Sequence, residues 1–440
     1  MARRPQQRHR RRRAASASGA PVLLEIREIG ARGDGLAEHD GRRVYVPLTV
    51  AGDRVRAALG EPRGDGVAAT LLEVTEPGPD RAAPPCRHFG TCGGCALQHV
   101  GDQAYGAWKR AQVSSALARA GLAGAEVAPT VRTPAASRRR ATFAATRRGS
   151  RCVLGFNERS SHRISAVTGC LVVEPAILEL LAPLEALACA ILQDGESADI
   201  SVAVLDGGID LVLTGCPEPG LDARERMAAF AETHDIGRLS WRRSAAAPAE
   251  PVAARRALHA RFGGVAVPVE PGAFLQASAA GEAALVEAVL AGVGAAARVA
   301  DLFAGLGTFS FPIASRPVPE TAVHAVEGDA SAHAALGAAG RGRAGVTAER
   351  RDLFADPLSA DELSRFDAVI FDPPRAGARA QSVQLAGSAV PTVVGVSCNP
   401  ATFARDARTL VDGGYRLERV TPIDQFLWSS HVELVGVFRR

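Results

Sequence analysis

The sequence of 440 residues predicts an α/β fold with three domains, the last of them Rossmann-like. From residue 272 onward, apolar strand-like runs alternate with helical segments, which is the pattern of a parallel sheet. Short alternating runs before residue 78 predict a small OB-like barrel, and three clustered cysteines mark a central α+β domain. We therefore expect a basic tail over residues 1–20, the barrel over 21–78, the central domain over 79–265 and the Rossmann-like domain over 266–440.

Charge and composition favour a cytoplasmic protein without a membrane segment. The net charge is only +4, but seven arginines fall within the first thirteen residues, a tail that we expect to be disordered and suited to phosphate. Lys109 is the only lysine, so the arginine bias partly reflects a coding preference and does not by itself predict RNA binding. The start has no apolar core for a secretory signal, and we disfavour a transit peptide. Glu179 and Pro183 interrupt the most apolar window, residues 176–192, which predicts a pair of core helices.

The segment over residues 21–77 predicts a five-stranded barrel. Glycine turns such as residues 33–35 separate four clear alternating runs, at residues 22–26, 42–47, 53–57 and 67–72. The segment resembles a TRAM domain, an OB-like RNA-binding module often fused to RNA-modifying enzymes. The alternative is a barrel that only caps the next domain.

Cys86, Cys92 and Cys95 form a C-x5-C-x2-C cluster, with two glycines that let the backbone wrap closely around a site. Thiolates select zinc or iron-sulfur clusters, and both usually need a fourth ligand. We expect Cys170 to supply it, with Cys152 as the rival. Because zinc ribbons generally pair two C-x2-C knuckles, which this chain lacks, the pattern favours a 4Fe-4S cluster over zinc. Three structural thiols are the alternative, and eight cysteines in all fit a reducing compartment better than a disulfide scaffold.

The central domain has a basic stretch that could bind nucleic acid. An amphipathic helix is expected over residues 102–120, followed by arginine-rich runs at residues 137–143 and 147–151 that alternate with apolar residues such as Phe143. A basic strand face with nearby aromatic rings can take phosphates and stacked bases. A solvated sheet face is the alternative. Residues 198–260 predict further strands and a helix without a chemical motif.

The Rossmann-like domain opens with a nucleotide-binding turn. A buried strand over residues 297–303 leads into Ala304-Gly305-Leu306-Gly307, where small residues let the backbone approach a ligand. Ser310 replaces the third glycine of the dinucleotide fingerprint, which weakens the case for NAD. Glu327 ends the second strand, placed to accept both hydroxyls of a ribose. The pattern favours S-adenosylmethionine, and a purely structural pair is the alternative.

Two further acids follow strands of this domain. Asp352 comes after the third strand, where it could meet an adenine edge. The fourth strand, over residues 366–371, ends in Asp372-Pro373-Pro374. The two prolines fix the backbone, so we expect Asp372 to be held over the cofactor cleft. A turn without a catalytic role is the alternative.

Cys398 ends the fifth strand just before a predicted helix. Asn399 is a good N-cap and Pro400 suits the first helical position, so a helix should run from residue 400 to about 411. A helix N-terminus favours the thiolate, the reactive form. The alternative is that Cys398 is a small buried apolar residue.

Glu433, at the start of the last strand, is the predicted partner of Cys398. C5 of a pyrimidine becomes nucleophilic enough to take a methyl group only after a thiolate adds to C6. A base must then remove the C5 proton so that the thiolate can leave. Cys398 and Glu433 could supply these two roles, unless Glu433 is simply a surface residue.

The ordered motifs CxxxxxCGGC, FLQ, DLFAGLGTFS, DPPRAG, SCNP and HVE resemble the RNA uracil-5-methyltransferase family, specifically its iron-sulfur, TRAM-containing branch that acts on 23S ribosomal RNA. The resemblance implies a class I methyltransferase domain in which Cys398 is the nucleophile and Glu433 the general base. We expect the protein to be a monomer. It also implies S-adenosylmethionine contacts at Gln276, Phe303, Thr308, Glu327 and Asp372, and cluster ligands at Cys86, Cys92, Cys95 and Cys170. RNA is the implied partner.

Two departures and three rival functions remain. Asn often stands where this chain has Thr308, and the central motif usually reads Tyr-Arg-Asn-Lys-Ala where this chain has Ser-Arg-Arg-Arg-Ala from residue 137. The substrate is therefore less certain than the reaction, and transfer RNA is an alternative. A 5-methylcytosine enzyme would have Pro-Cys at the fourth strand, and an amino-methyltransferase an aromatic residue at Arg375. A non-catalytic RNA-binding scaffold is the rival from another class.

Overall fold

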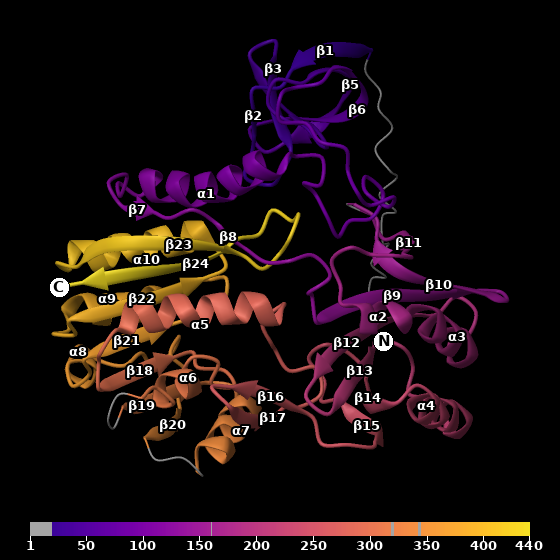
Figure 1. The fold of residues 1–440 in the computed structure, drawn as a ribbon. Helices are drawn as coiled ribbons and strands as arrows, with labels where there is room; N and C mark the ends of the chain where they lie inside the picture. Colours follow the sequence, from indigo (N-terminus) through magenta and orange to yellow (C-terminus); the bar gives the residue numbers. More distant parts are fainter. Residues whose placement is uncertain (1–19, 160, 318–320, 342–344) are drawn as a thin grey trace, which may run out of the picture. The chain divides into compact units, whose positions relative to one another are not determined.

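The computed structural model describes residues 20–159, 161–317, 321–341 and 345–440. The predicted basic tail therefore lies, apart from its last residue, outside the described residues. The chain divides into two compact units (Figure 1). The first contains the described residues up to Tyr105 with short segments at 159–162 and 428–430, and the second contains the rest. Within the described residues, no helix is both long and apolar enough to span a membrane.

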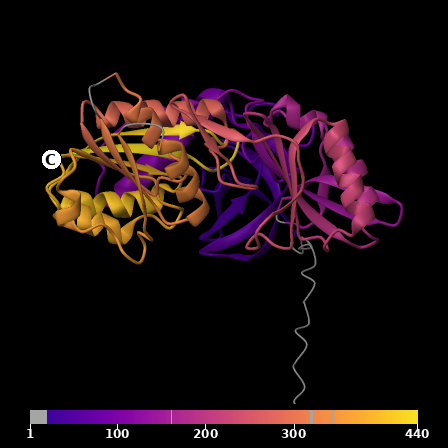
Figure 2. The same cartoon turned by 90° about the horizontal axis from the view of Figure 1, so that it is seen from below.

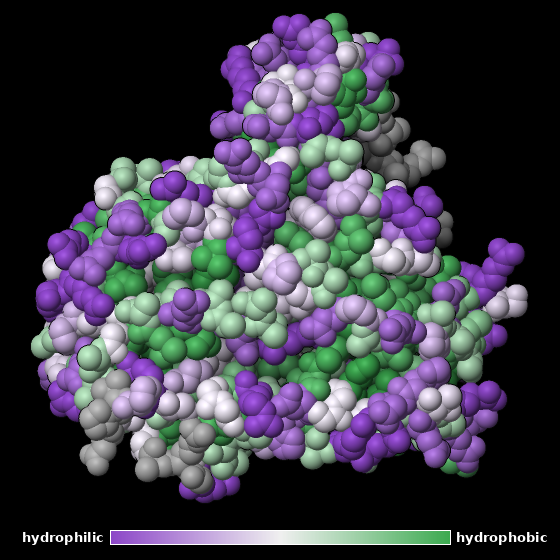
Figure 3. All heavy atoms as spheres, viewed as in Figure 1, coloured by the Kyte–Doolittle hydropathy of each residue, from purple (hydrophilic) through white to green (hydrophobic). Residues whose placement is uncertain are grey.

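The first unit is built on a six-stranded sheet in the order β1-β5-β6-β4-β3-β2. Its apolar residues alternate along the strands, so that Leu24, Val46 and Val55 share one buried face. The expectation of five strands is wrong by one, because a two-residue strand pairs with β3. The side of this unit that is visible in Figure 3 is mostly hydrophilic. The strands are β1 (Pro21–Glu25), β2 (Glu28–Ile29), β3 (Gly35–His39), β4 (Arg42–Val46), β5 (Arg54–Arg63) and β6 (Gly66–Glu76).

The arginine-rich part of the chain forms a seven-stranded sheet in the order β11-β10-β9-β12-β13-β14-β15. Ala141, Phe143 and Ala145 alternate along β9 and face an apolar core that also contains the helix pair expected over residues 176–192. The bounds are β9 (Arg140–Arg148), β10 (Arg151–Asn157), β11 (Ile164–Ala166), α2 (Pro175–Glu179), α3 (Leu181–Ile191), β12 (Ser197–Leu205), β13 (Gly208–Thr214), α4 (Leu221–Thr233), β14 (Ile236–Arg242) and β15 (Glu250–Ala254).

The C-terminal part forms a nine-stranded sheet in which β20, β19, β18, β21 and β22 are parallel neighbours in that order. β24 lies antiparallel between β22 and β23. The bounds are α5 (Ala279–Val293), β18 (Arg298–Leu302), α6 (Ser310–Ala314), β19 (Ala322–Glu327), α7 (Ala330–Gly340), β20 (Val346–Arg350), α8 (Ala360–Leu363), β21 (Ala368–Phe371), α9 (Arg379–Gly387), β22 (Thr392–Ser397), α10 (Pro400–Asp412), β23 (Arg416–Asp424) and β24 (Glu433–Arg439). The predicted alternation of strand and helix is confirmed.

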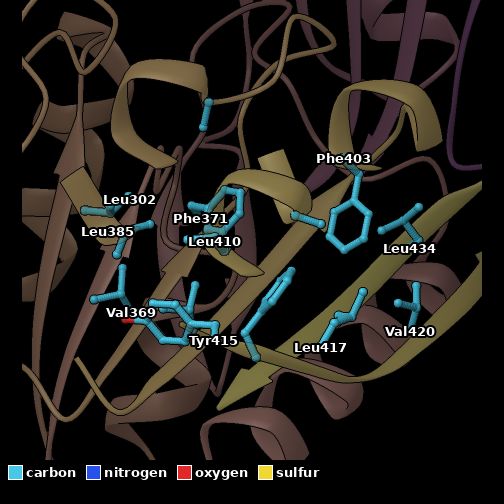
Figure 4. Close-up of a cluster of buried hydrophobic side chains, with 14 of the residues drawn as sticks. Leu302, Val369, Phe371, Leu385, Phe403, Leu410, Tyr415, Leu417, Val420 and Leu434 are labelled. Atoms are coloured by element: carbon cyan, nitrogen blue, oxygen red, sulfur yellow. The ribbon is translucent and has the colours of Figure 1, made fainter. Parts of the chain in front are cut away.

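Helices cover both faces of this sheet (Figure 2). Successive residues of β22 point to opposite faces, and Val393 belongs to one buried cluster whereas Val394 and Val396 belong to another. The cluster around Val393 packs against α10, as the side chains of Phe403, Leu410 and their neighbours show in Figure 4. The opposite cluster packs against α5. Burial on both faces explains the three valines of β22, which is buried along its whole length.

Two segments belong with the C-terminal part although their sequence position predicted the central domain: one extends the nine-stranded sheet, and the other is a separate hairpin that packs on its helices. From Gly106 on, α1 (Asp102–Arg119) packs Val113 and Leu117 into the cluster of α10, and β7 (Glu126–Val127) and β8 (Val131–Arg132) pair with β23. The hairpin of β16 (His259–Phe262) and β17 (Val265–Pro268) packs its apolar residues against α6 and α7. A boundary at 265/266 would cut this hairpin, so composition alone misplaced it.

Candidate active site

The carboxyl edge of the parallel sheet brings three predicted residues to one level. Leu302 pairs with Val326 on one side and with Phe371 on the other. The next residues, Phe303, Glu327 and Asp372, therefore end three adjacent strands side by side. The chain runs outward from β18 in one direction through β19 and in the other through β21, so this edge is the topological switch point where open α/β sheets bind ligands.

The turn after β18 has a backbone conformation typical of ligand-binding turns. Phe303 has a φ of 61°, a conformation that a bulky residue rarely adopts and that marks functional turns. Gly305, at φ 55°, faces open space in which a side chain would meet nothing. The Glu327 carboxylate accepts backbone N–H bonds from Gly305 and from Asp329, both at 2.7 Å. The acid is thus fixed directly against the glycine turn.

Cys398 lies opposite Glu433. Ser397 pairs with Leu434 in the antiparallel ladder of β22 and β24, so the next pair in register is Cys398 with Glu433. Their proximity also appears in the electrostatics, because the charge of Glu433 raises the pKa of the Cys398 thiol. The predicted helix and cap are confirmed, since α10 begins at Pro400 and the Asn399 side chain accepts the Ala401 N–H.

A pair of glycines seats α10 on the sheet. Gly395 and Gly436 face each other across β22 and β24. A Cβ at Gly436 would lie 2.3 Å from the ring of Phe403, and one at Gly395 would lie 2.8 Å from the ring of Phe371 and 3.2 Å from that of Phe403. Phe403 fills the space that the two glycines leave. This close approach fixes the start of α10 and hence the position of Cys398.

The electrostatics of Cys398 correct one expectation. Burial and, after it, the neighbouring charges of Glu433 and Asp372 raise the pKa of the thiol to about 11, and Arg375 opposes this rise. The direction is opposite to the lowering of the pKa that we expected from the helix N-terminus. Desolvation and two carboxylates outweigh the helix terminus at this position.

Glu433 is nearly fully buried and has an unusual charge state. Burial raises its pKa to about 7, and this rise is opposed by a hydrogen bond from Gln425 and by the cations Arg140, Lys109 and Arg375. Burial also raises the pKa of Asp372 well above its usual range, with further contributions from Glu433 and Asp301. A carboxyl group whose pKa lies near neutrality can both accept and release a proton at physiological pH.

Two polar residues complete the surroundings of Glu433 and were missed by sequence reasoning. Lys109 is fully buried, lies 2.9 Å from Asp424 and donates to the backbone oxygen of His431. Gln425 is also buried, and its amide donates to Gln276 at 2.7 Å. No sequence pattern distinguishes this glutamine, but a lone lysine on the apolar side of a helix could have suggested a buried ion pair.

The remaining predicted ligand residues lie in different surroundings. Thr308 is half-buried in the turn after β18, and the exposed Asp352 accepts the backbone N–H of Phe354. The ring of Phe354 lies 5.4 Å from that of Phe303. Phe354 also borders an apolar cavity of about 470 Å³ next to the Asp-Pro-Pro turn, lined in addition by Ala376, Gly377, Arg379, Ala380 and Val383.

The predicted cluster ligands lie in two different units of the fold. Cys86, Cys92 and Cys95 are half-buried in a turn-rich loop of the first unit, and Cys170 belongs to the second. Backbone N–H groups of Gly94 and Val172 lie 3.4 Å from the sulfurs of Cys92 and Cys170. Hydrogen bonds of this kind tune metal-bound thiolates. In the part of the chain that the structure describes, no three His, Cys, Asp or Glu side chains are grouped closely enough to hold one ion.

Cys152, the rival ligand, is buried in the core of the seven-stranded sheet. Burial raises the pKa of its thiol to about 12, and the neighbouring Cys189 contributes to this rise. A buried thiol of this kind is a poor metal ligand because it resists losing its proton.

Comparison with known proteins identifies the family. The family model for tRNA (Uracil-5-)-methyltransferase matches residues 357–440. The chain is 34% identical to the 23S rRNA (uracil(1939)-C(5))-methyltransferase RlmD of Halomonas elongata, over 96% of this chain and 90% of that protein. It is 44% identical to an uncharacterised RNA methyltransferase of Brucella suis, over 95% and 97% of the two chains.

A solved structure shares the fold. The tRNA (uracil-54, C5)-methyltransferase of Pyrococcus abyssi, in complex with S-adenosyl-L-homocysteine, superposes with a TM-score of 0.74 at 22% identity, over 95% of this chain and 100% of that one. The sequence identity over nearly the full length of a relative and the matched family model agree with the order of the sequence motifs. The chain therefore belongs to the RNA uracil-5-methyltransferase family and is an RNA uracil-5-methyltransferase.

Proposed function

We propose that this enzyme methylates C5 of a uridine in 23S ribosomal RNA with S-adenosylmethionine, through a covalent bond between Cys398 and C6 of the base. The observation that carries the mechanism is the strand register that puts Cys398 opposite Glu433. A nucleophile and a base on facing residues of one ladder can act on the two adjacent carbons of a single ring.

The first step activates Cys398. Because burial raises the pKa of the Cys398 thiol, its proton must leave before attack, and the neighbouring Glu433 carboxylate is the group that can accept it. The sulfur then bonds to C6, and the electrons of the C5–C6 double bond move onto C5 and O4. Glu433 passes the proton on to solvent, which its pKa near neutrality permits.

The second step forms and frees the product. When bound, S-adenosylmethionine would supply an electrophilic methyl group to C5, with cleavage of its bond between sulfur and methyl and release of S-adenosylhomocysteine. The Glu433 carboxylate then removes the proton on C5, the double bond between C5 and C6 forms again, and the bond between C6 and sulfur breaks. Cys398 departs as thiolate and regains a proton.

The carboxyl edge of the sheet fits the methyl donor. Glu327, held against the glycine turn, is proposed to bind the ribose, and the open space at Gly305 leaves room for the ligand. Gln276, Phe303, Thr308 and Asp372 are proposed as further contacts, and Asp352 as a contact of the adenine.

We also propose a 4Fe-4S cluster with Cys86, Cys92, Cys95 and Cys170 as ligands. The proposal is supported by the cysteine spacing and by the N–H groups directed at two of the sulfurs. When bound, the cluster supplies a rigid link between chain segments, and no step of the methylation involves it. Brown protein with iron and sulfide is expected. Colourless protein with stoichiometric zinc would contradict the proposal.

Mapping of 5-methyluridine by nucleoside mass spectrometry tests the reaction and its target. Ribosomal and transfer RNA from cells without this protein should lack the modification at one position of 23S rRNA, and the wild-type protein should restore it. A Cys398→Ala variant should restore nothing. Loss of the modification in transfer RNA would favour the other substrate, for which the matched family model and the Pyrococcus structure provide precedents. Normal methylation by Cys398→Ala would refute the covalent mechanism.

A further inference from the structure

We propose that Gln425 is a positioning residue that fixes the general base Glu433 and the cofactor-binding Gln276 relative to each other. This inference rests on the proposed function of those two residues. Gln425 follows the last residue of β23, beside the ladder that carries Glu433, and is 3% exposed. It touches neither reacting carbon of the base in the proposed mechanism, so it would act through its neighbours.

Two hydrogen bonds fix both ends of the Gln425 amide. Its Oε1 accepts the backbone N–H of Ala277 at 2.9 Å. Because a backbone N–H can only donate, this contact fixes which end of the amide is oxygen. The Nε2 group is then the donor, and one of its hydrogens goes to Gln276 Oε1 at 2.7 Å. The second hydrogen is left for the neighbouring Glu433 carboxylate, whose pKa Gln425 lowers.

The same bonds orient Gln276. Because its Oε1 already accepts from Gln425, its own Nε2 is the end left to donate to a ligand. Its backbone is held as well, since Arg139 donates to the Gln276 carbonyl oxygen at 3.2 Å and forms a partly buried ion pair with Glu282 at 2.6 Å. An oriented amide donor suits the carboxylate of a methionine moiety or a carbonyl oxygen of a base.

The first turn of α5 leaves space for the Gln425 side chain. α5 begins at the N-cap Ser278, whose side chain accepts the N–H of Gly281. A Cβ at Gly281 would lie 2.5 Å from the Cβ of Gln425, so only glycine leaves room for this side chain in the first turn of the helix. Asp424, one residue earlier, is tied down by Thr133 and Lys109.

Gln425 differs from the other groups around Glu433 because it is an uncharged hydrogen-bond donor. A donor to the ionised carboxylate stabilises the form that must accept the C5 proton, against the cost of burial. The charged or titratable groups that also face Glu433 are Arg140 from β9, Lys109 from α1, Arg375 and Asp372 from the turn after β21, and Cys398 after β22.

The test compares Gln425→Met with the wild-type enzyme. The substitution keeps the volume and removes both donor hydrogens. Three changes are expected: the acid limb of the single-turnover pH profile moves up by about one unit, the KM for S-adenosylmethionine rises about tenfold, and methylated enzyme–RNA adduct that survives SDS accumulates. A purely structural residue would lower the amount of active enzyme and leave these three quantities unchanged.

Gln381→Met is the matched control. Gln381 is another buried glutamine of the second unit, and its amide bonds the backbone of Leu358 at both ends. Its removal should lower stability and leave the pH profile, the KM and the adduct level as in the wild type. Gln425→Asn, which keeps an amide but is too short to reach both partners, should show the same three changes if Gln425→Met does not fold. If both Gln425 variants match the control, the inference is refuted. If the wild type makes no 5-methyluridine, the proposed function fails instead.

Discussion

Replacing Lys109 by Met should destabilise the second unit and impair the general base. Lys109 and Asp424 are both fully buried, with Nζ and Oδ1 2.9 Å apart, and Lys109 also donates to the backbone oxygen of His431. The substitution leaves the Asp424 carboxylate in the core without its main counter-charge. It also removes one of the cations that oppose the rise of the Glu433 pKa.

The expected loss of stability is about 3 kcal/mol. Removing one partner of a buried ion pair costs about 3–5 kcal/mol, because the other charge stays buried. Arg132 lies 3.7 Å from the second oxygen of Asp424, so part of the charge remains compensated and the lower end applies. The double variant Lys109→Met/Asp424→Asn, which removes both charges, should recover most of the loss.

Urea unfolding measures the change in the stability of the second unit. The pH profile of the methylation rate measures the change in the pKa of Glu433. With Lys109 gone, the pKa of Glu433 should rise above about 7, so the acid limb of the rate moves to higher pH. Arg226→Met, which breaks an exposed i,i+4 pair with Asp222, is the control and should cost less than about 0.5 kcal/mol. If Lys109→Met costs no more than this control, or if the double variant is as unstable as the single one, the reasoning is wrong.

Three further outcomes follow from the same structure. Burial and Glu433 raise the pKa of Cys398 to about 11, so iodoacetamide should alkylate the enzyme slowly at pH 7 and faster as the pH rises. The Glu433→Gln variant should be alkylated faster than the wild type at pH 8, and equal rates in the two proteins would contradict this. Burial raises the pKa of Asp301 to about 7, so its contribution to stability is present below the usual carboxyl pKa near 4 and lost as the pH rises through 7. In Asp301→Asn, urea midpoints should depend less on pH over this range, and an unchanged slope would count against it. Gly281→Ala, which ordinarily stabilises a helix by up to about 1 kcal/mol, should here destabilise the protein because the new methyl group overlaps Gln425, and a raised urea midpoint would disprove the contact.

Most of the local fold could be predicted from periodicity and caps. The helix that starts at Pro400, its cap Asn399 and the apolar strand before Cys398 all follow from short-range rules. Long-range pairing could not be predicted in the same way. The two-residue strands β7 and β8 carry almost no periodic pattern, and only the exposed edge of β23 gives them a partner.

The candidate site shows the same division. Cys398 and Asp372 directly follow β22 and β21, and Glu433 begins β24, so strand order and register were enough to bring them together. The charge state of Cys398 was not predictable, because it depends on two carboxylates that arrive from other strands. Gln425 also escaped prediction, since its role depends on the space above Gly281, which lies far from it in sequence.

The covalent adduct is the most direct test of the mechanism. A Glu433→Gln variant should still form the bond between Cys398 and C6 and accept the methyl group, but it should not remove the C5 proton. Incubation with substrate RNA and S-adenosylmethionine, followed by protease and nuclease digestion, should yield a peptide in which Cys398 carries one methylated uridine, as seen by tandem mass spectrometry. An adduct on another residue, or full release of 5-methyluridine by this variant, would contradict the assignment of Cys398 and Glu433.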